Sequence, residues 1–232
     1  MTEEEDHLPE RNRPLTAVEK KNVELKNQQL GFEIRYSAAR AEVAELELLK
    51  ARDVEKDRQA KPGITRRLNF FGDVSPSNVD NVIEALDHWS VRDPGEPIVI
   101  TFNTQGGSVT DGLALYDTIK RLQRAGHFVT TRTVGMAASM GAVLFQAGDV
   151  RIMDARAKLL IHEGSTQGGA RMTAGEAEDY AEFWKMLRSD ILDILSERSS
   201  LTKRQLDSRW KRKDWWLTAA EALKFGFTDV VE

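Results

Sequence analysis

From Ile64 onward, short apolar runs rich in β-branched residues alternate with longer segments whose apolar side chains recur at helical spacing. "PIVITFN" at 97–103 is an almost continuous apolar run, which is typical of a strand buried in a parallel sheet. Ser108–Arg124, which follows it, has its large apolar residues on one helical face. Because strands and helices alternate in this way, the sequence predicts an α/β domain with helices packed on a parallel sheet.

The expected elements follow this alternation along the chain. Strands are expected at 68–71, 97–103, 128–134, 150–153 and 159–161, and helices at 76–89, 108–124, 173–198, 202–209 and 218–225, with one more helix beginning inside 135–145. Ligand sites in such folds lie beyond the carboxyl ends of the strands, so functional side chains are expected there.

The first 62 residues follow another pattern. They are densely charged, and between Leu15 and Asp57 they contain no proline and one glycine. Apolar residues recur at every seventh position, at Val18, Leu25, Phe32, Ala39 and Leu46, with Tyr36 and Val43 beside them. This heptad stripe predicts a long helix over 15–58 that packs on a partner helix, as in a coiled coil, or on its own domain; a solvated single helix is the alternative. "KPG" ends the segment, so we expect a charged helical extension over 1–62 and an α/β domain over 63–232.

The composition narrows the classes of function. A net charge of −4 gives no reason to expect nucleic acid or an anionic membrane as a partner. The chain has no cysteine, which excludes disulfides and thiolate metal sites and suits a reducing compartment. Its polar, acidic start is unlike a secretory signal, and its longest apolar run is too short to span a bilayer. We therefore expect a cytoplasmic protein with no metal and no cofactor.

A single serine, Ser139, lies among small and apolar residues in "GMAASMGAVLF", where a predicted strand turns into a helix. Gly135 is expected to permit the turn, and the small residues let the start of the helix lie close to its neighbours. The positive end of the helix dipole and the N–H of Met140 then favour negative charge beside the serine, as at the nucleophile of other hydrolases. The alternative is a packing role, in which the hydroxyl bonds to the preceding backbone turn.

Two other strand ends carry polar or glycine-rich segments. Strand 159–161 runs directly into His162 and a Gly/Ser loop, and strand 97–103 is followed by adjacent glycines at 106–107 that let the backbone approach a ligand. Each feature alone favours a structural role. Together with Ser139 at the same edge of the sheet, they favour a serine–histidine pair.

A serine–histidine pair needs a carboxylate that orients the imidazole. Asp190 and Asp193 are expected on the solvated face of a helix, whereas Asp207 and Asp214 flank the basic run "SRWKRK". We expect Asp214 to be the orienting carboxylate, because the following "WWL" can bury its surroundings.

Segment 173–198 carries more apolar surface than one small domain is expected to cover, which favours association. The residues concerned are Tyr180, Phe183, Trp184, Leu187, Ile191 and Leu195.

Four segments, "FNTQGGSVTDGLALYDTI", "GMAASMGAVLFQAGD", "LLIHEG" and "DWWLTAAEALKFGFTDVV", together resemble the proteolytic subunit of the Clp protease, a self-compartmentalising serine peptidase, from about Arg67 to the C-terminus. The resemblance implies that Ser139 is the nucleophile, His162 the general base and Asp214 its orienting group. It also implies that the N–H groups of Gly107 and Met140 form the oxyanion hole. The implied fold is ClpP/crotonase-like, built of repeated ββα units with the helical extension added.

The same resemblance implies a homo-oligomer, a heptameric ring or double ring that encloses the active sites, with 173–198 as the helix that pairs the rings. The expected function is that of a serine endopeptidase acting on polypeptide substrates.

The chain departs from the family pattern at three places. Gln105 stands where the family has proline, and Glu163-Gly164 follow His162 in place of Gln-Pro. The charged helix replaces the short axial loops that engage an unfoldase, which puts docking of a Clp-type ATPase in doubt. A phage-type capsid maturation protease acting without an unfoldase, a catalytically silent ring or scaffold protein, and a crotonase-like acyl-CoA enzyme are the alternatives.

Overall fold

The structure is a computed structural model of the whole chain, and it describes residues 16–31, 33, 35, 40, 66–164, 173–211 and 213–232. The chain divides into two units, Met1–Glu45 and Leu46–Glu232. The domain boundary expected between residues 62 and 63 lies outside the described residues. In the described ranges, no helix is long and apolar enough to cross a membrane.

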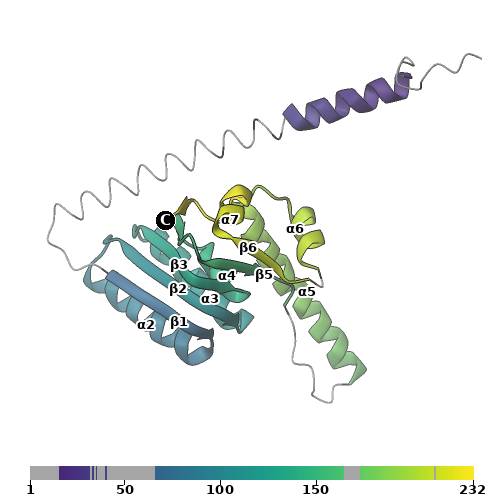
Figure 1. Cartoon of the computed structure of the whole chain (residues 1–232). Helices are drawn as coiled ribbons and strands as arrows, with labels where there is room; N and C mark the ends of the chain where they lie inside the picture. The colour runs from purple at the N-terminus through teal and green to yellow at the C-terminus, as the bar shows by residue number, and fades with distance from the viewer. Residues whose placement is uncertain are drawn as a thin grey trace, which may run out of the picture. The chain divides into compact units, whose positions relative to one another are not determined.

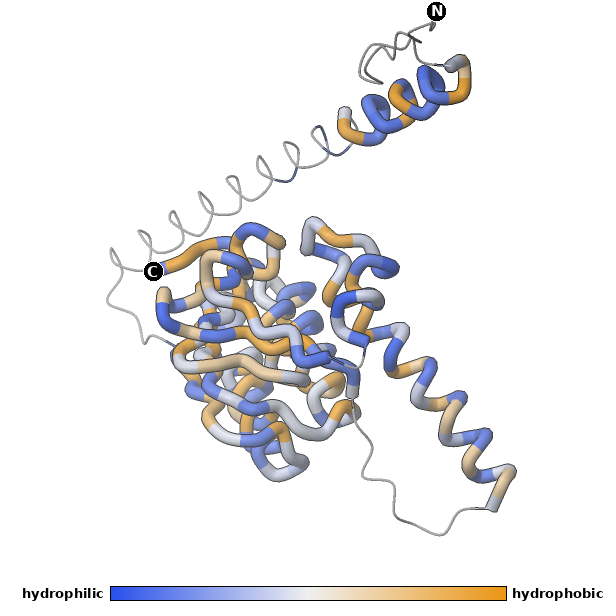
Figure 2. The backbone as a smooth tube through the Cα atoms, turned by 45° about the vertical axis from the view of Figure 1, so that its right-hand side comes forward, coloured by the Kyte–Doolittle hydropathy of each residue, from blue (hydrophilic) through white to orange (hydrophobic). Residues whose placement is uncertain are grey.

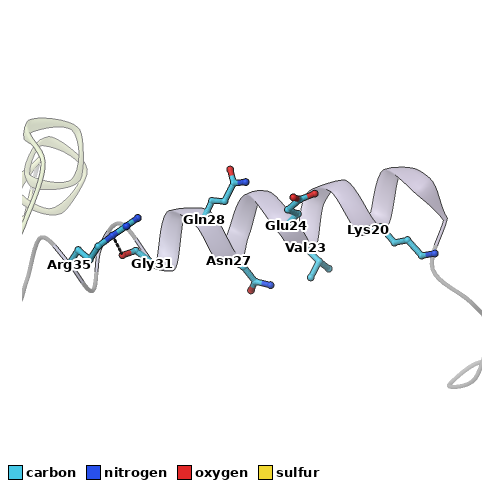
Figure 3. A pocket seen from close by; sticks show the side chains of 7 residues that line it. All are labelled: Lys20, Val23, Glu24, Asn27, Gln28, Gly31 and Arg35. Atoms are coloured by element: carbon cyan, nitrogen blue, oxygen red, sulfur yellow. Dashed lines mark hydrogen bonds between the residues drawn. The ribbon is translucent and has the colours of Figure 1, made fainter.

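The longest continuous described segment of the first unit is a helix over residues 17–31, the thick purple ribbon in Figure 1. Thr16 and Glu19 cap its start, because the Thr16 hydroxyl accepts from the Glu19 N–H at 3.3 Å and the Glu19 carboxylate accepts from the Thr16 N–H at 2.7 Å. Val18 and Leu25, the first two residues of the heptad stripe, are exposed; the rest of the stripe and the expected continuation of the helix to residue 58 lie outside the continuous described helix. Figure 3 shows other residues of this segment, most of them polar; the Arg35 Nε donates to the Gly31 carbonyl oxygen at 3.2 Å.

The described part of the second unit contains one seven-stranded sheet (Figure 1). Its strands are β1 (Arg66–Val74), β2 (Ile98–Gly107), β3 (Val129–Ala138), β4 (Val150–Met153), β5 (Lys158–Ile161), β6 (Trp215–Thr218) and β7 (Val230–Val231). The main path runs β1-β2-β3-β4-β7 with every neighbouring pair parallel, which confirms the predicted parallel α/β architecture.

Strand β3 is shared by two parts of the sheet. Its first half pairs with β4, and its last residues, Met136–Ala138, pair with β5. Gly135 lies between the two pairings with φ +64°, a conformation that suits glycine. The prediction that the chain turns at Gly135 is wrong, because β3 continues through it to Ala138. Strand β6 then pairs antiparallel with β5, so β6 begins where β5 ends.

The helices of the second unit match the predicted segments to within about three residues. They are α2 (Pro76–Arg92), α3 (Val109–Arg124), α4 (Met140–Phe145), α5 (Ala174–Glu197), α6 (Lys203–Trp210) and α7 (Ala219–Phe225). Side chains fix several of their starts. Ser108 caps α3, and Thr173, Thr202 and Thr218 form capping boxes at the starts of α5, α6 and α7.

One apolar core joins the sheet to the helices. Helices α2 and α3 contact each other and pack on β1, whereas α4 packs on β2 and β3. Phe102, Phe145 and Phe227 are fully buried in this core. Figure 2 shows the hydrophobic segments gathered in the sheet. The sheet and helix α3 therefore both support α4, with Ser139 at its start.

The first half of α5 projects from the domain (Figures 1 and 2). Tyr180 and Phe183 there are 37% and 39% exposed, and Met186 is 57% exposed. Leu187, Ile191 and Leu195 lie further along the helix and are buried against their own domain. Of the six apolar residues that favoured association, these three are therefore covered by their own domain.

Candidate active site

Ser139 occupies the turn between β3 and α4, as N-cap of the helix. Its φ and ψ are 56° and −123°, and it is the one non-glycine residue with positive φ in the described part of the chain. Such a conformation costs about 1–3 kcal/mol and persists only where the surroundings hold it. Here the Ser139 N–H donates to the Leu160 carbonyl at 2.9 Å, and the Ser139 carbonyl accepts from the Ala142 N–H at 3.0 Å. The neighbouring strand and helix therefore hold Ser139 in a strained turn.

Glycines let strand β2 pack directly on this turn. A Cβ at Gly106 would lie 2.6 Å from both the Ala138 oxygen and the Ser139 Cβ, and 3.0 Å from the Met140 nitrogen. A Cβ at Gly141 would lie 2.4 Å from the Thr104 Cγ2. The prediction that small residues allow close backbone approach is confirmed. Both glycines of the 106–107 pair belong to β2 and have positive φ, so the strand extends four residues beyond its expected end at residue 103.

Gly107 is the last residue of β2, and its N–H belongs to the proposed oxyanion hole. It is held against β1, because a Cβ there would lie 2.3 Å from the Val74 oxygen. Met140 is the first residue of α4, so its N–H has no acceptor within the helix. Ser139, Met140 and His162 line one pocket, whereas Gly107 is not among the residues that line it.

His162 follows β5 directly and faces the carboxylate of Asp214. The Nδ1 of His162 is 3.4 Å from the Asp214 Oδ1. The sheet register explains the pairing: Ile161 lies opposite Trp215 in the antiparallel β5–β6 pair, so the next residues outward are His162 and Asp214. The other ring nitrogen of His162, Nε2, can then accept a proton, and the His162 residue lines the same pocket as Ser139.

Asp214 pairs with His162 for a reason other than the one that the sequence suggested. Its side chain is 64% exposed, and Trp216, two residues further on, is 49% exposed. The expectation that "WWL" buries the surroundings of Asp214 is therefore wrong, although Leu217 itself is buried. The competing candidate, Asp207, is paired elsewhere: its carboxylate forms an ion pair with Arg188 and accepts from the Trp210 indole N–H at 3.3 Å. Strand register, rather than burial, brings Asp214 to the histidine.

The rest of the pocket lining is apolar and includes residues that the sequence analysis missed. Trp210 of α6 lines it together with Ile191 and Leu195 of α5, two of the apolar residues that favoured association. The apolar spacing of α5 could have indicated that these two are inward-facing. No local signal marks Trp210, because α6 reaches the pocket only through the tertiary fold.

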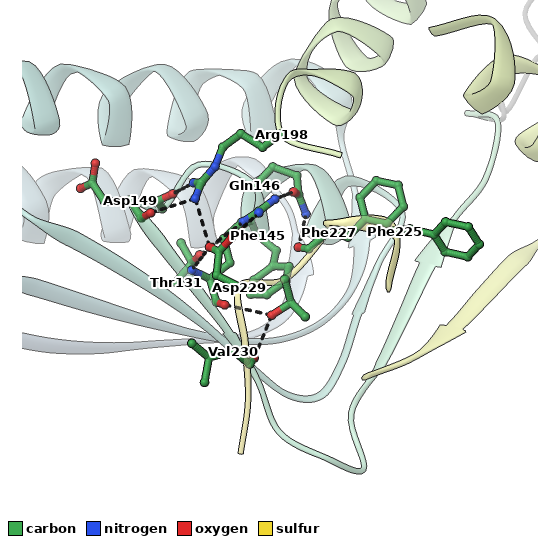
Figure 4. A network of polar contacts seen from close by, with 12 residues as sticks. Thr131, Phe145, Gln146, Asp149, Arg198, Phe225, Phe227, Asp229 and Val230 are labelled. Atoms are coloured by element: carbon green, nitrogen blue, oxygen red, sulfur yellow. Dashed lines mark hydrogen bonds and ion pairs between the residues drawn. The ribbon is translucent and has the colours of Figure 1, made fainter. Parts of the chain in front are cut away.

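A buried polar network anchors the far end of α4 (Figure 4). Gln146, which follows the last residue of α4, donates to the Phe227 carbonyl at 3.2 Å and accepts from the Arg151 Nη1 at 2.5 Å. The Asp229 Oδ2 accepts from the Arg151 Nε at 3.0 Å and from the Arg198 Nη2 at 3.1 Å. The network therefore ties the helix that begins at Ser139 to β4, α5 and the C-terminal segment.

Two arginines, Arg151 and Arg198, contact the carboxylate of Asp229 in this network. Burial alone would raise the pKa of the Asp229 carboxyl, but the hydrogen bonds and charge of Arg151, with the charge of Arg198, outweigh it and hold that pKa below its usual value. The Arg151 and Asp229 side chains are 3% and 7% exposed. Their mutual attraction therefore offsets much of the free-energy cost of removing the two charges from water.

A serine in a strained strand-to-helix turn, beside a histidine that faces a carboxylate, is the arrangement typical of serine hydrolases. The known proteins similar to this chain narrow that class. The family model described as "Clp protease" matches residues 64–232. The chain is 32% identical, over 189 residues, to ATP-dependent Clp protease proteolytic subunit 1 of Chlamydia pneumoniae, covering 81% of this chain and 95% of that protein. It is 33% identical, over 170 residues, to the ATP-dependent Clp protease proteolytic subunit of Streptococcus suis, covering 72% of this chain and 84% of that protein.

This chain therefore belongs to the Clp protease family, and it is an enzyme of the ClpP-like serine peptidase class. Both the resemblance and the fold expected from the sequence are confirmed.

Proposed function

We propose that this protein is a serine endopeptidase in which Ser139, His162 and Asp214 form the catalytic triad. One observation carries the proposal. The strained Ser139 lines the same pocket as His162, and the Nδ1 of His162 lies 3.4 Å from the Oδ1 of Asp214. Asp214 accepts from Nδ1–H of His162 and so keeps Nε2 unprotonated, ready to act as a base.

In this reaction, the Ser139 hydroxyl attacks the carbonyl carbon of the scissile peptide as His162 takes its proton. The oxyanion that forms accepts hydrogen bonds from the backbone N–H groups of Gly107 and Met140. His162 then gives the proton to the leaving amine, and water releases the acyl group from Ser139 by the same steps in reverse order. The strain at Ser139 supports this role, because strained backbone concentrates at functional sites.

We further propose that the substrate is a polypeptide and that the enzyme works as a homo-oligomeric ring, heptameric in one or two layers. The exposed Tyr180 and Phe183 on the projecting half of α5, with Met186 just beyond it, support an intersubunit contact there. Residues 63–232 are proposed as the peptidase domain and 1–62 as a helical extension. A chain without cysteine suits a reducing compartment, so we place the enzyme in the cytoplasm.

Replacing Ser139 by alanine tests the triad. Ser139→Ala should lower peptide hydrolysis by several orders of magnitude while the folded assembly persists, because it removes one hydroxyl. Ser90→Ala, on helix α2, is the matched control and should keep full activity. Turnover near that of the wild type in purified Ser139→Ala protein would refute the assignment.

A further inference from the structure

The pocket that contains Ser139 and His162 is very small. Its volume is about 20 Å³, and its other lining includes Val109, Ile161 and Trp210. A site needs roughly 10–15 Å³ of such volume to hold one water molecule. The space therefore admits about one group the size of a water molecule or a methyl group.

The wall formed by α4 cannot give way to a larger group. Met140 is already in close contact with α3, since a Cβ at Gly112 would lie 2.3 Å from the Met140 Cγ. Gly141 lies equally close to Thr104 of β2. Both contacts belong to the strained turn that positions Ser139, so shifting this wall would shift the serine itself.

Trp210 of α6 also lines the pocket, and this tryptophan is only 2% exposed. Its N–H donates to the Asp207 Oδ1 at 3.3 Å, and Asp207 is ion-paired with Arg188. The guanidinium of Arg188 also lies over the indole ring, 5.7 Å from its centroid. The ring is therefore held at its edge and on its face, and turning it out of the pocket would break these contacts and expose a large apolar surface.

On the basis of the proposed function, we infer that Trp210 restricts this peptidase to substrates with a small residue, alanine or glycine, at P1, the residue that donates the scissile carbonyl. An alanine methyl group fits the space beside Ser139. Leucine or phenylalanine would have to displace the indole ring. Trp210 is the largest side chain of the lining and lies outside the strained turn, so it can limit size without positioning the nucleophile.

Covalent labelling measures this restriction without a long substrate. The full-length protein is treated with peptidyl phosphonate esters that differ only in the P1 side chain, and the rate of phosphonylation at Ser139 is followed by mass spectrometry. The alanine reagent should label at least about 10-fold faster than the leucine and phenylalanine reagents, which is the discrimination expected of a pocket that is too small by a few carbon atoms. The Trp210→Leu variant should raise the leucine rate relative to the alanine rate at least about 10-fold.

Two variants keep the result interpretable. Trp210→Phe retains a ring in the core and should shift the preference in the same direction by less. Trp89→Leu removes a partly buried tryptophan of α2 that packs on the core away from the pocket, and it should leave the P1 profile unchanged.

A wild-type protein that labels equally fast, or faster, with the leucine reagent overturns the inference, as does a profile that neither Trp210 variant changes. A fluorophosphonate without a peptide portion separates this failure from failure of the proposed function. If that reagent labels Ser139 while the P1 profile is flat, the size restriction alone is wrong. If it does not label Ser139, the proposed catalytic role is wrong.

Discussion

At the scale of single residues, two positions, Ser139 and Asp214, decide whether this site can work. Ser139 has a backbone conformation that few residues other than glycine adopt, and glycine at 106 lets β2 press against it. The sequence indicated the serine and its small neighbours. It could not indicate that the serine itself, rather than Gly135, makes the turn, because that depends on how β3 pairs with both β4 and β5.

The close approach at Gly106 predicts a specific defect. Gly106→Ala should slow phosphonylation of Ser139 by at least about 10-fold and lower the free energy of unfolding, because its Cβ would lie 2.6 Å from the Ser139 Cβ. Gly126→Ala is the matched control: its φ of +97° is close to the +94° of Gly106, but a Cβ there has no neighbour within 4 Å. Backbone strain is common to both variants, so equal labelling rates would contradict the proposed contact between β2 and the nucleophile.

Asp214 is the second deciding residue. Asp214→Asn should keep the fold but lower kcat for peptide hydrolysis by up to about 10⁴-fold, since the imidazole would lose the partner that sets its tautomer. Asp193→Asn is the control, because Asp193 is exposed on α5 and pairs with Lys203. Steady-state kinetics on both variants measure this effect. A drop in kcat confined to Asp193→Asn would mean that Asp214 is not the orienting carboxylate.

At the scale of secondary-structure elements, hydrophobic periodicity predicted most helices and strands, including the long α5 and the buried β2 and β3. It missed β6, because "WWLT" becomes a strand only through pairing with β5. That pairing also places Asp214 opposite His162, so the sequence could suggest Asp214 but gave a wrong physical reason for it. Register between distant segments is a property of tertiary structure, which a local pattern does not contain.

The network at the far end of α4 predicts a pH-dependent stability. The folded-state pKa of Asp229 lies below its unfolded value, so its stabilisation is present above about pH 4 and is lost as pH falls through the folded-state pKa. Asp229→Asn should lower the free energy of unfolding at pH 7 by roughly 3–5 kcal/mol, because the buried Arg151 would lose its charged partner.

Urea unfolding at several pH values measures this difference, which should shrink as the pH falls below about 4. Asp87→Asn is the control. Both side chains of its ion pair with Arg121 are exposed, so this variant should lower the free energy of unfolding by only about 0–1 kcal/mol. Equal costs for the two variants at pH 7 would mean that the buried network does not stabilise the fold as described.

At the scale of the whole molecule, the exposed apolar residues of α5 predict association. Phe183→Glu combined with Met186→Glu should shift the protein toward smaller species in light scattering, because charges would replace exposed apolar surface. Val91→Glu, at an 84% exposed position on α2, is the control and should leave the mass unchanged. A wild-type protein with the mass of one chain at working concentration would refute the proposed oligomer.

The central claim is that Ser139 is the nucleophile of a serine peptidase, and the site of covalent modification tests it most directly. The full-length protein is treated with a fluorophosphonate, its intact mass is measured, and the modified peptide is sequenced. We expect one adduct per chain, located on Ser139, and its loss in Ser139→Ala and in His162→Ala. An adduct on another serine, or no adduct on a folded and assembled protein, would contradict the claim.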